Sequence, residues 1–186
     1  YTILPALKYY GIDCLDYVIM THTDEDHVSG IRELLEENYP IKNIILPNRE
    51  KIQNSKQQKL KKDSHILQMR KDDQIQLGKV CFLCLHPQKD WTDDDANSGS
   101  LVLYLQYEKF TMLFTGDLNG EQEPLLEEKG ERNCLRSINI LKVAHHGSKN
   151  STTKNFLKKC RPEKAIISAG KNNRYGHPHK ESLQRL

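Results

Sequence analysis

Two histidines and three carboxylates stand within six consecutive residues near the start of this chain. The segment reads His-Thr-Asp-Glu-Asp-His from His22 to His27 and follows the apolar run 17–20. Imidazole nitrogens and short carboxylates are ligands that divalent metal ions take in proteins. A polar loop with a capping aspartate would need one carboxylate, so we interpret this segment as metal-binding.

Two further polar corners have the same character. Asp117 follows the apolar run 112–114, and His145 and His146 follow the predicted strand 138–143. In layered α/β folds, sites assemble beyond the carboxyl ends of strands. Three corners that carry only histidine and aspartate therefore predict one polynuclear metal centre. Asp117 has a carboxylate that can bridge two cations, and Gly116 allows a tight turn before it.

Apolar runs and amphipathic segments alternate along the chain, with hairpin signals in the middle. The predicted strands are 17–20, 41–46, 74–77, 80–85, 101–107, 110–114, 138–143 and 164–168. The predicted helices are 3–10, 28–37, 49–62, a segment near 121–129, 151–159 with Ser151 or Thr152 as its cap, and a final start after Pro178. This order indicates an α/β protein with a mixed sheet. At 186 residues, the chain is expected to form a single domain over 1–186.

Four segments give a resemblance to a known family. They are 21–30, Leu-Phe-Thr-Gly-Asp-Leu at 113–118, Leu-Lys-Val-Ala-His-His-Gly-Ser at 141–148, and Asn-Asn-Arg-Tyr-Gly-His-Pro-His at 172–179. Together they resemble the metallo-β-lactamase superfamily and, in closer detail, the β-lactamase-like domains of the ComEC family of competence DNA-uptake channel proteins. The resemblance implies an αββα sandwich of the metallo-β-lactamase type. It also implies a fragment of a larger protein that lacks the family's N- and C-terminal strands.

The same resemblance implies two divalent metal ions and no organic cofactor. The ligands that it implies are His22, Asp24, Asp26, His27, Asp117, His145 and His146. His22 and Asp24 would hold one ion, and Asp26 and His27 the other. Asp117 would bridge the two ions, and one of the two adjacent histidines at 145 and 146 would complete the second site.

One ligand of the superfamily has no counterpart here. Relatives usually supply a further histidine some two dozen residues before the bridging aspartate, where this chain has Asp95, Asn97 and Ser98. Asn97, Asp95 or water is expected to take its place. His86 lies nearby but is expected to be a strand-end residue. Because the site would have more oxygen donors than sites of relatives with histidine at these positions, it suits Mn²⁺ as well as Zn²⁺.

The chemistry that we expect is hydrolysis of a phosphodiester by a metal-activated hydroxide. Asp26 would orient the nucleophile, and His146 or His177 would stabilise the developing charge or protonate the leaving oxygen. The resemblance implies DNA as the substrate and degradation of one strand during uptake. The residues expected to contact the substrate are Asn97, Ser98, Ser148, Asn173, Arg174 and His179.

The distribution of charge agrees with a polyanionic partner, although the net charge of +3 is too small to argue for one. Eight Lys or Arg residues lie between Arg49 and Lys71, and more follow from Lys142 to Arg185. Such segments are also typical of solvated helix faces; with DNA as the partner, they would contact the phosphate backbone without regard to sequence. No aromatic stacking platform is evident, so readout of bases is not expected.

The resemblance also implies a second partner, the membrane channel portion of the same protein. It places the domain at the cell membrane, on the outer face. The sequence leaves two other functions open: hydrolysis of a small phosphodiester or another ester, and a non-catalytic role in DNA binding or regulation of the uptake channel.

Overall fold

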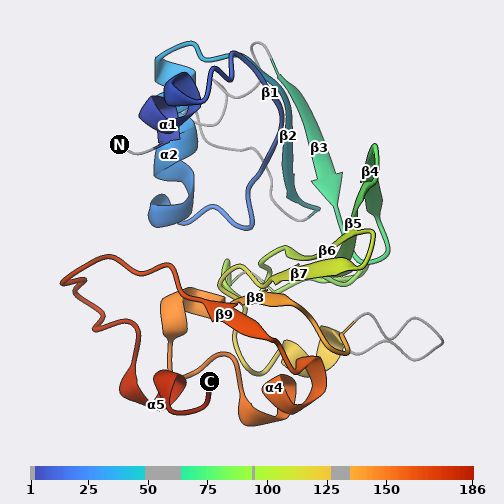
Figure 1. Cartoon of the computed structure of the whole chain (residues 1–186), viewed down its shortest axis with the longest axis vertical. Helices are drawn as coiled ribbons and strands as arrows, with labels where there is room; N and C mark the ends of the chain where they lie inside the picture. Colours follow the sequence, from blue (N-terminus) through green and yellow to red (C-terminus); the bar gives the residue numbers. More distant parts are fainter. Residues whose placement is uncertain (1–2, 49–63, 94, 127–134) are drawn as a thin grey trace. The chain divides into compact units, whose positions relative to one another are not determined.

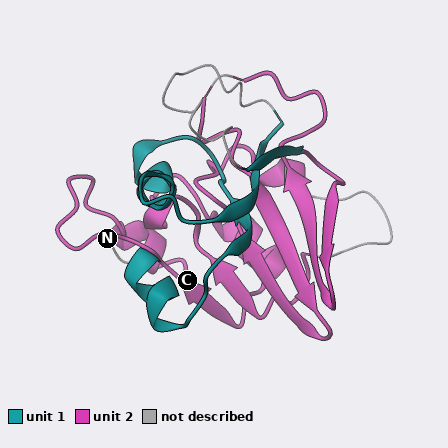
Figure 2. Ribbon diagram, turned by 90° about the horizontal axis from the view of Figure 1, so that it is seen from above, with its two compact units in different colours: residues 1–69 teal, residues 70–186 magenta. Residues whose placement is uncertain are grey.

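The structure is a computed structural model that describes residues 3–48, 64–93, 95–126 and 135–186. It divides the chain into two compact units, residues 1–69 and residues 70–186 (Figure 2). The helix predicted at 49–62 lies outside the described residues. Among those described, no helix combines the length and the apolar character that crossing a membrane requires.

The first unit is built on a three-stranded parallel sheet. Its strands are β1 (Leu15–Ile19), β2 (Ile41–Pro47) and β3 (His65–Met69), in the order β1-β2-β3. The central strand is the most apolar because its residues pack between two neighbours, with Ile44 paired to Val18 and Ile66. Polar residues at two of its five positions, without strict alternation, explain why β3 was not predicted.

Helices α1 (Ile3–Tyr9) and α2 (Glu25–Glu36) pack on one side of this sheet (Figure 1). The apolar side of α2 buries Ile31 and Leu34 in a core shared with the strands. This helix begins three residues before the predicted Val28. The segment that carries the metal-ligand pattern is therefore partly helical.

The second unit contains a six-stranded mixed sheet, in the order β4-β5-β6-β7-β8-β9. The strands are β4 (Gln74–Leu77), β5 (Val80–His86), β6 (Val102–Tyr107), β7 (Phe110–Phe114), β8 (Ile140–Lys142) and β9 (Lys164–Ile166). Neighbours from β4 to β7 are antiparallel, and β7, β8 and β9 run parallel. Both predicted hairpins are confirmed.

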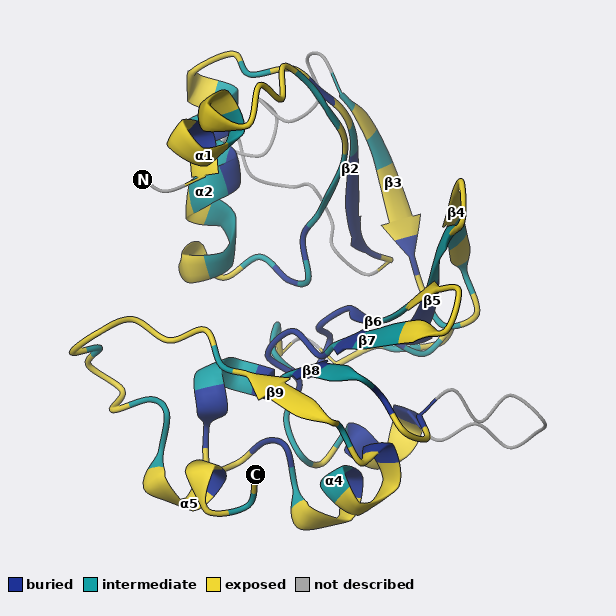
Figure 3. Cartoon of the chain, viewed as in Figure 1, coloured by how far each residue is buried: buried dark blue, intermediate teal, exposed yellow. Residues whose placement is uncertain are grey.

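One face of this sheet carries the main core of the unit. Leu113 of β7 and Leu141 of β8 meet Leu118, Leu126 and Phe156 there, and all five are buried. Figure 3 colours the buried parts of the chain dark blue. The covering elements are the 3-10 turn η2 (Glu123–Leu126) and helix α4 (Lys154–Cys160). An acidic helix was predicted near 121–129; its residues 123–126 form η2, and residues 127–129 lie outside the described residues.

Helix α4 is capped by Thr153, not by the predicted Ser151 or Thr152. The Thr153 hydroxyl accepts a hydrogen bond from the Phe156 N–H at 3.3 Å and donates one to Glu123 Oε2 at 2.5 Å. The Thr153 N–H also donates to the Glu123 carboxylate. Burial raises the pKa of Glu123, while the Thr153 hydrogen bonds act in the opposite direction.

Replacing this cap tests the packing of α4. We expect Thr153→Ala to lower the free energy of unfolding by about 1–2 kcal/mol, because it removes an N-cap and leaves a buried carboxylate short of a donor. Urea unfolding followed by circular dichroism measures the change, and Thr153→Ser, which keeps the hydroxyl, is the matched control. Equal midpoints for wild type and the alanine variant would contradict the assigned cap.

Candidate metal centre

The first group of candidate ligands lies where β1 gives way to α2. His22 is fully buried, and the Thr21 hydroxyl lies 3.0 Å from its Nδ1 atom and 3.4 Å from Nδ1 of His27. The two imidazole rings have centroids 4.0 Å apart. Thr21 thus contacts both rings at Nδ1, and the Nε2 atoms of both rings lie beside carboxylates.

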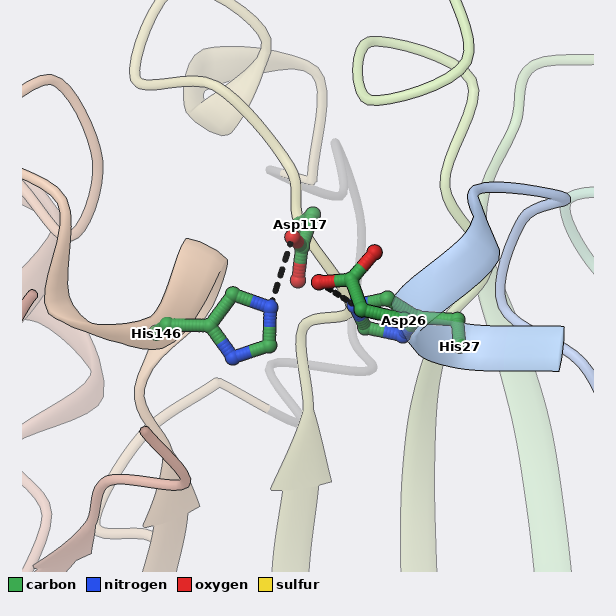
Figure 4. Close-up of side chains that lie close together, drawn as sticks. All are labelled: Asp26, His27, Asp117 and His146. Carbon is green, nitrogen blue, oxygen red and sulfur yellow. Dashed lines mark ion pairs between the residues drawn. The ribbon is translucent and has the colours of Figure 1, made fainter. Parts of the chain in front are cut away.

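Each histidine of this group has a carboxylate beside its Nε2 atom. Asp24 Oδ2 lies 3.8 Å from His22 Nε2, and Asp26 Oδ2 lies 3.8 Å from His27 Nε2 (Figure 4). These separations exceed hydrogen-bond length, but metal bonds of about 2.0–2.2 Å can reach both atoms of a pair. The structure therefore brings the four predicted ligands together as two nitrogen–oxygen pairs.

The backbone at the start of α2 explains where the carboxylates of this group lie. Asp24 is the N-cap of α2, and its carbonyl accepts the N–H groups of His27 and Val28 at 2.9 and 3.1 Å. Its side chain makes no capping hydrogen bond, so the carboxylate turns toward His22 instead. Asp26 and His27 lie in the first turn, where the helix dipole favours negative charge.

The second group of candidate ligands is built around Asp117. Gly116, at φ +52°, turns the chain after β7, and the Asp117 N–H donates to the Ser100 hydroxyl at 3.2 Å. The Asp117 Oδ2 atom lies 3.2 Å from His146 Nε2 (Figure 4) and 3.9 Å from His145 Nε2. Both histidines of the predicted pair therefore reach the same carboxylate.

The two histidines owe this position to an unusual backbone. His145, His146 and Gly147 have φ values of +47°, +53° and +83°, and positive φ in residues other than glycine costs about 1–3 kcal/mol each. The His145 N–H donates to the Gly116 carbonyl at 3.1 Å, which ties the turn to the Asp117 corner. Thr152 Oγ1 accepts the Ala144 N–H at 3.1 Å and supports the turn from the other side.

The two rings differ in their surroundings. His146 Nδ1 lies 2.6 Å from the Ser168 carbonyl, to which it can donate a hydrogen bond, and its Nε2 faces Asp117. The hydrogen bond with Asp117, above all, raises the pKa of His146 to about 8. Among the described residues, the buried Nδ1 of His145 has no hydrogen-bond partner. A backbone carbonyl on the far nitrogen is typical of metal-binding histidines, so His146 has the better geometry for a ligand.

His177 and His179 lie beside this turn. The His177 ring is 5.4 Å from that of His145, 6.3 Å from that of His146 and 4.7 Å from that of His179, measured between centroids. Burial, and then the neighbouring histidines, lower the pKa of His177. His179 Nδ1 accepts the Lys149 N–H at 3.1 Å, which gives this ring a part in holding the loop together.

Most of the other predicted substrate residues hold loops in shape. Ser98 is buried, and its hydroxyl donates to Asp93 at 2.8 Å. Ser148 is also buried, and its hydroxyl accepts the Asn150 N–H at 3.3 Å. Asn97 keeps a buried Oδ1 with no hydrogen-bond partner among the described residues.

His86 ends β5 as predicted, and it is buried with Nε2 2.8 Å from the Ser98 carbonyl. Sequence reasoning missed three supporting residues: Ser100, Ser168 and Lys142, whose Nζ lies 4.0 Å from Asp117 Oδ1. Lys142 could have been noticed from its position three residues before the histidine pair. A serine in a polar loop carries no comparable signal.

The chain belongs to the metallo-β-lactamase superfamily, whose family model matches residues 2–171. It is 37% identical over 194 residues to ComE operon protein 3 of Bacillus subtilis, covering 99% of this chain and 24% of that protein. It is 32% identical over 186 residues to Recombination protein 2 of Haemophilus influenzae, covering 99% of this chain and 21% of the relative. Competence protein ComA of Neisseria gonorrhoeae is 30% identical over 176 residues, with coverage of 95% and 23%.

These relatives confirm the predicted resemblance to competence proteins of the ComEC type. The chain spans about a quarter of their length or less. Among solved structures, the metallo-β-lactamase fold protein YhfI of Bacillus subtilis is similar, with a TM-score of 0.58 at 14% identity over 100% of this chain and 78% of that one. CmlA, a diiron β-hydroxylase from Streptomyces venezuelae, gives 0.57 at 10% identity over 89% and 40%. The predicted metallo-β-lactamase fold is therefore confirmed.

Gly147 is the residue on which the histidine turn depends most directly. A Cβ atom there would lie 2.6 Å from Pro178 Cβ, in addition to the strain at φ +83°. We expect Gly147→Ala to displace His145 and His146 and to weaken Mn²⁺ binding by about 10-fold or more, as loss of supporting contacts does in metal sites. Isothermal titration calorimetry measures the affinity.

Gly78→Ala is the matched control, because Gly78 has φ +58° but its added Cβ would meet no atom within 4 Å. It shares the backbone strain and lies in the β4–β5 turn, so metal affinity should stay at the wild-type value. Equal affinities for wild type and Gly147→Ala would contradict the role given to the turn.

Proposed function

We propose that this chain is a metal-dependent phosphodiesterase that degrades DNA during uptake. The observation that carries the proposal is the set of histidine–carboxylate pairs at 22–27 and around Asp117, in a member of the metallo-β-lactamase superfamily. No serine or cysteine nucleophile is required by this chemistry.

The donor atoms suit two divalent ions of the Zn²⁺ or Mn²⁺ type. His22 with Asp24 would hold one ion and Asp26 with His27 the other, and Asp117 would bridge them. His146 would complete the second site, since its Nδ1 is engaged by the Ser168 carbonyl. When bound, such a pair of ions lowers the pKa of a water molecule and stabilises negative charge on a phosphoryl group.

Other side chains would handle the substrate and its protons. Asp26, with a side chain 61% exposed, would accept a hydrogen bond from the attacking water and orient it. His177, whose pKa is lowered by burial and by neighbouring histidines, would donate a hydrogen bond from its ring N–H to the leaving oxygen. Asn97 would supply an oxygen where relatives have a further histidine.

DNA is proposed as the substrate because the similar proteins are named for competence and recombination. From Lys164 to Lys180 the chain contains four Lys or Arg residues and no acid, which suits a phosphate backbone. We further propose that the chain is attached to a membrane channel portion of the same protein and acts on the outer face of the cell membrane.

Cleavage of DNA with and without metal tests the proposal. We expect Mn²⁺- or Zn²⁺-dependent degradation of plasmid and linear DNA that EDTA abolishes. Asp117→Asn should lower the rate by more than about 100-fold, because loss of a bridging ligand exceeds the loss expected for a supporting residue. Glu108→Gln, which changes an exposed carboxylate in the β6–β7 turn, is the control and should cleave at the wild-type rate.

Two outcomes would redirect the assignment. Protein that hydrolyses bis-p-nitrophenyl phosphate with Mn²⁺ but never DNA would be a small-diester hydrolase. Protein that binds DNA and cleaves neither substrate with any divalent metal would be a binding or regulatory domain.

A further inference from the structure

Four planar groups form a column that runs from the exposed Arg174 and Tyr175 side chains to the candidate centre. The Arg174 guanidinium lies over the Tyr175 ring, with Cζ 4.7 Å from its centroid. The Tyr175 and His177 rings are inclined by 24° with centroids 5.8 Å apart, and those of His177 and His146 by 23° at 6.3 Å. His146 in turn contacts Asp117.

The exposed end of this column is open to a ligand. Tyr175 keeps 60% of its surface accessible, although Arg174 and His177 both lie against it. The loop between β9 and α5 that carries it projects from the unit and is largely exposed (Figures 1 and 3). A large exposed aromatic ring on such a loop has no part in the core.

The loop is nevertheless held in one shape. The Asn173 side chain donates to the carbonyls of Gly170 and His177, at 2.8 and 2.5 Å, and accepts the His177 N–H at 2.9 Å. Gly176, at φ +69°, makes the turn between Tyr175 and His177. Asn173, predicted to contact substrate, therefore uses its amide within the loop, and Tyr175 is presented on a prearranged support.

The charge around the column favours a polyanion. Lys171, Arg174 and Lys180 are exposed on this loop or beside it, and the nearest acids in the sequence are Glu163 and Glu181. An arginine lying over an exposed aromatic ring, with further cations nearby, is a combination that binds single-stranded nucleic acid, because a base stacks on the open plane of the guanidinium while the backbone phosphates meet the cations. Bases in a duplex are already stacked and are not available to it.

We propose that Tyr175 and Arg174 form a stacking platform for an unpaired base of single-stranded DNA. The platform binds the nucleotide next to the phosphate that the candidate centre attacks. This inference rests on the proposed function, and it gives that site a preference for an unpaired strand that the sequence did not lead us to expect.

Binding to labelled oligonucleotides in EDTA, where no cleavage occurs, tests the platform by fluorescence anisotropy. The probes are a single-stranded oligothymidylate, an abasic strand of the same length and the corresponding duplex. Wild type should bind the oligothymidylate about 10-fold more tightly than the abasic strand. Tyr175→Ala should bind the oligothymidylate and the abasic strand with the same low affinity. Tyr175→Phe should keep the wild-type difference in affinity between these two strands.

Two variants complete the comparison. Arg174→Lys keeps the charge but loses the planar group, and should reduce the preference for the oligothymidylate over the abasic strand. Tyr107→Ala removes another exposed tyrosine, at the end of the β6–β7 hairpin remote from Asp117, and should bind as wild type does.

The outcomes separate the platform from the proposed nuclease. The platform would be overturned if wild type bound the oligothymidylate and the abasic strand with equal affinity. It would also be overturned if Tyr175→Ala lowered the affinities for the single strand and for the duplex by the same factor. Base-dependent binding that needs Tyr175, in a protein that never cleaves DNA with Mn²⁺, would overturn the nuclease and leave the platform standing.

Discussion

The contact between Asp117 and His146 is the interaction on which the second unit's polar site depends. It forms only because His145, His146 and Gly147 adopt left-handed backbone conformations, tied to Gly116 through the His145 N–H. Strain of this kind persists where the surrounding structure fixes it. Here Thr152, the Ser168 carbonyl and Pro178 are the groups that do so.

The first unit also places histidines beside carboxylates, but it does so without a left-handed backbone turn. A buried parallel strand and an amphipathic helix meet at a corner, and Asp24 caps the helix through its backbone while its carboxylate turns to His22. Thr21 contacts both imidazole rings at Nδ1. The carboxylates need no strain because they project from the helix start, where negative charge is favoured.

Much of this could be predicted from the sequence. The hairpins followed from Gly78-Lys79 and Glu108-Lys109, and the clusters of candidate ligands followed from their chemistry at the ends of predicted strands. The early start of α2 was missed because its first turn is as polar as a loop. The left-handed turn at His145 and His146 was not predictable from residue types, because neither position is glycine. The Tyr175 column was missed because it depends on how Asn173 folds a loop without periodicity.

The proposed function requires that the residues at 22–27 and those around Asp117 hold the same divalent ions. The most direct measurement is anomalous scattering at the Mn or Zn absorption edge from crystals of metal-loaded protein. We predict two peaks, each bonded to His22 with Asp24 or to Asp26 with His27, with Asp117 bonded to both and His146 to one. Peaks bonded to one of these groups alone, or no peak beside Asp117, would contradict the account.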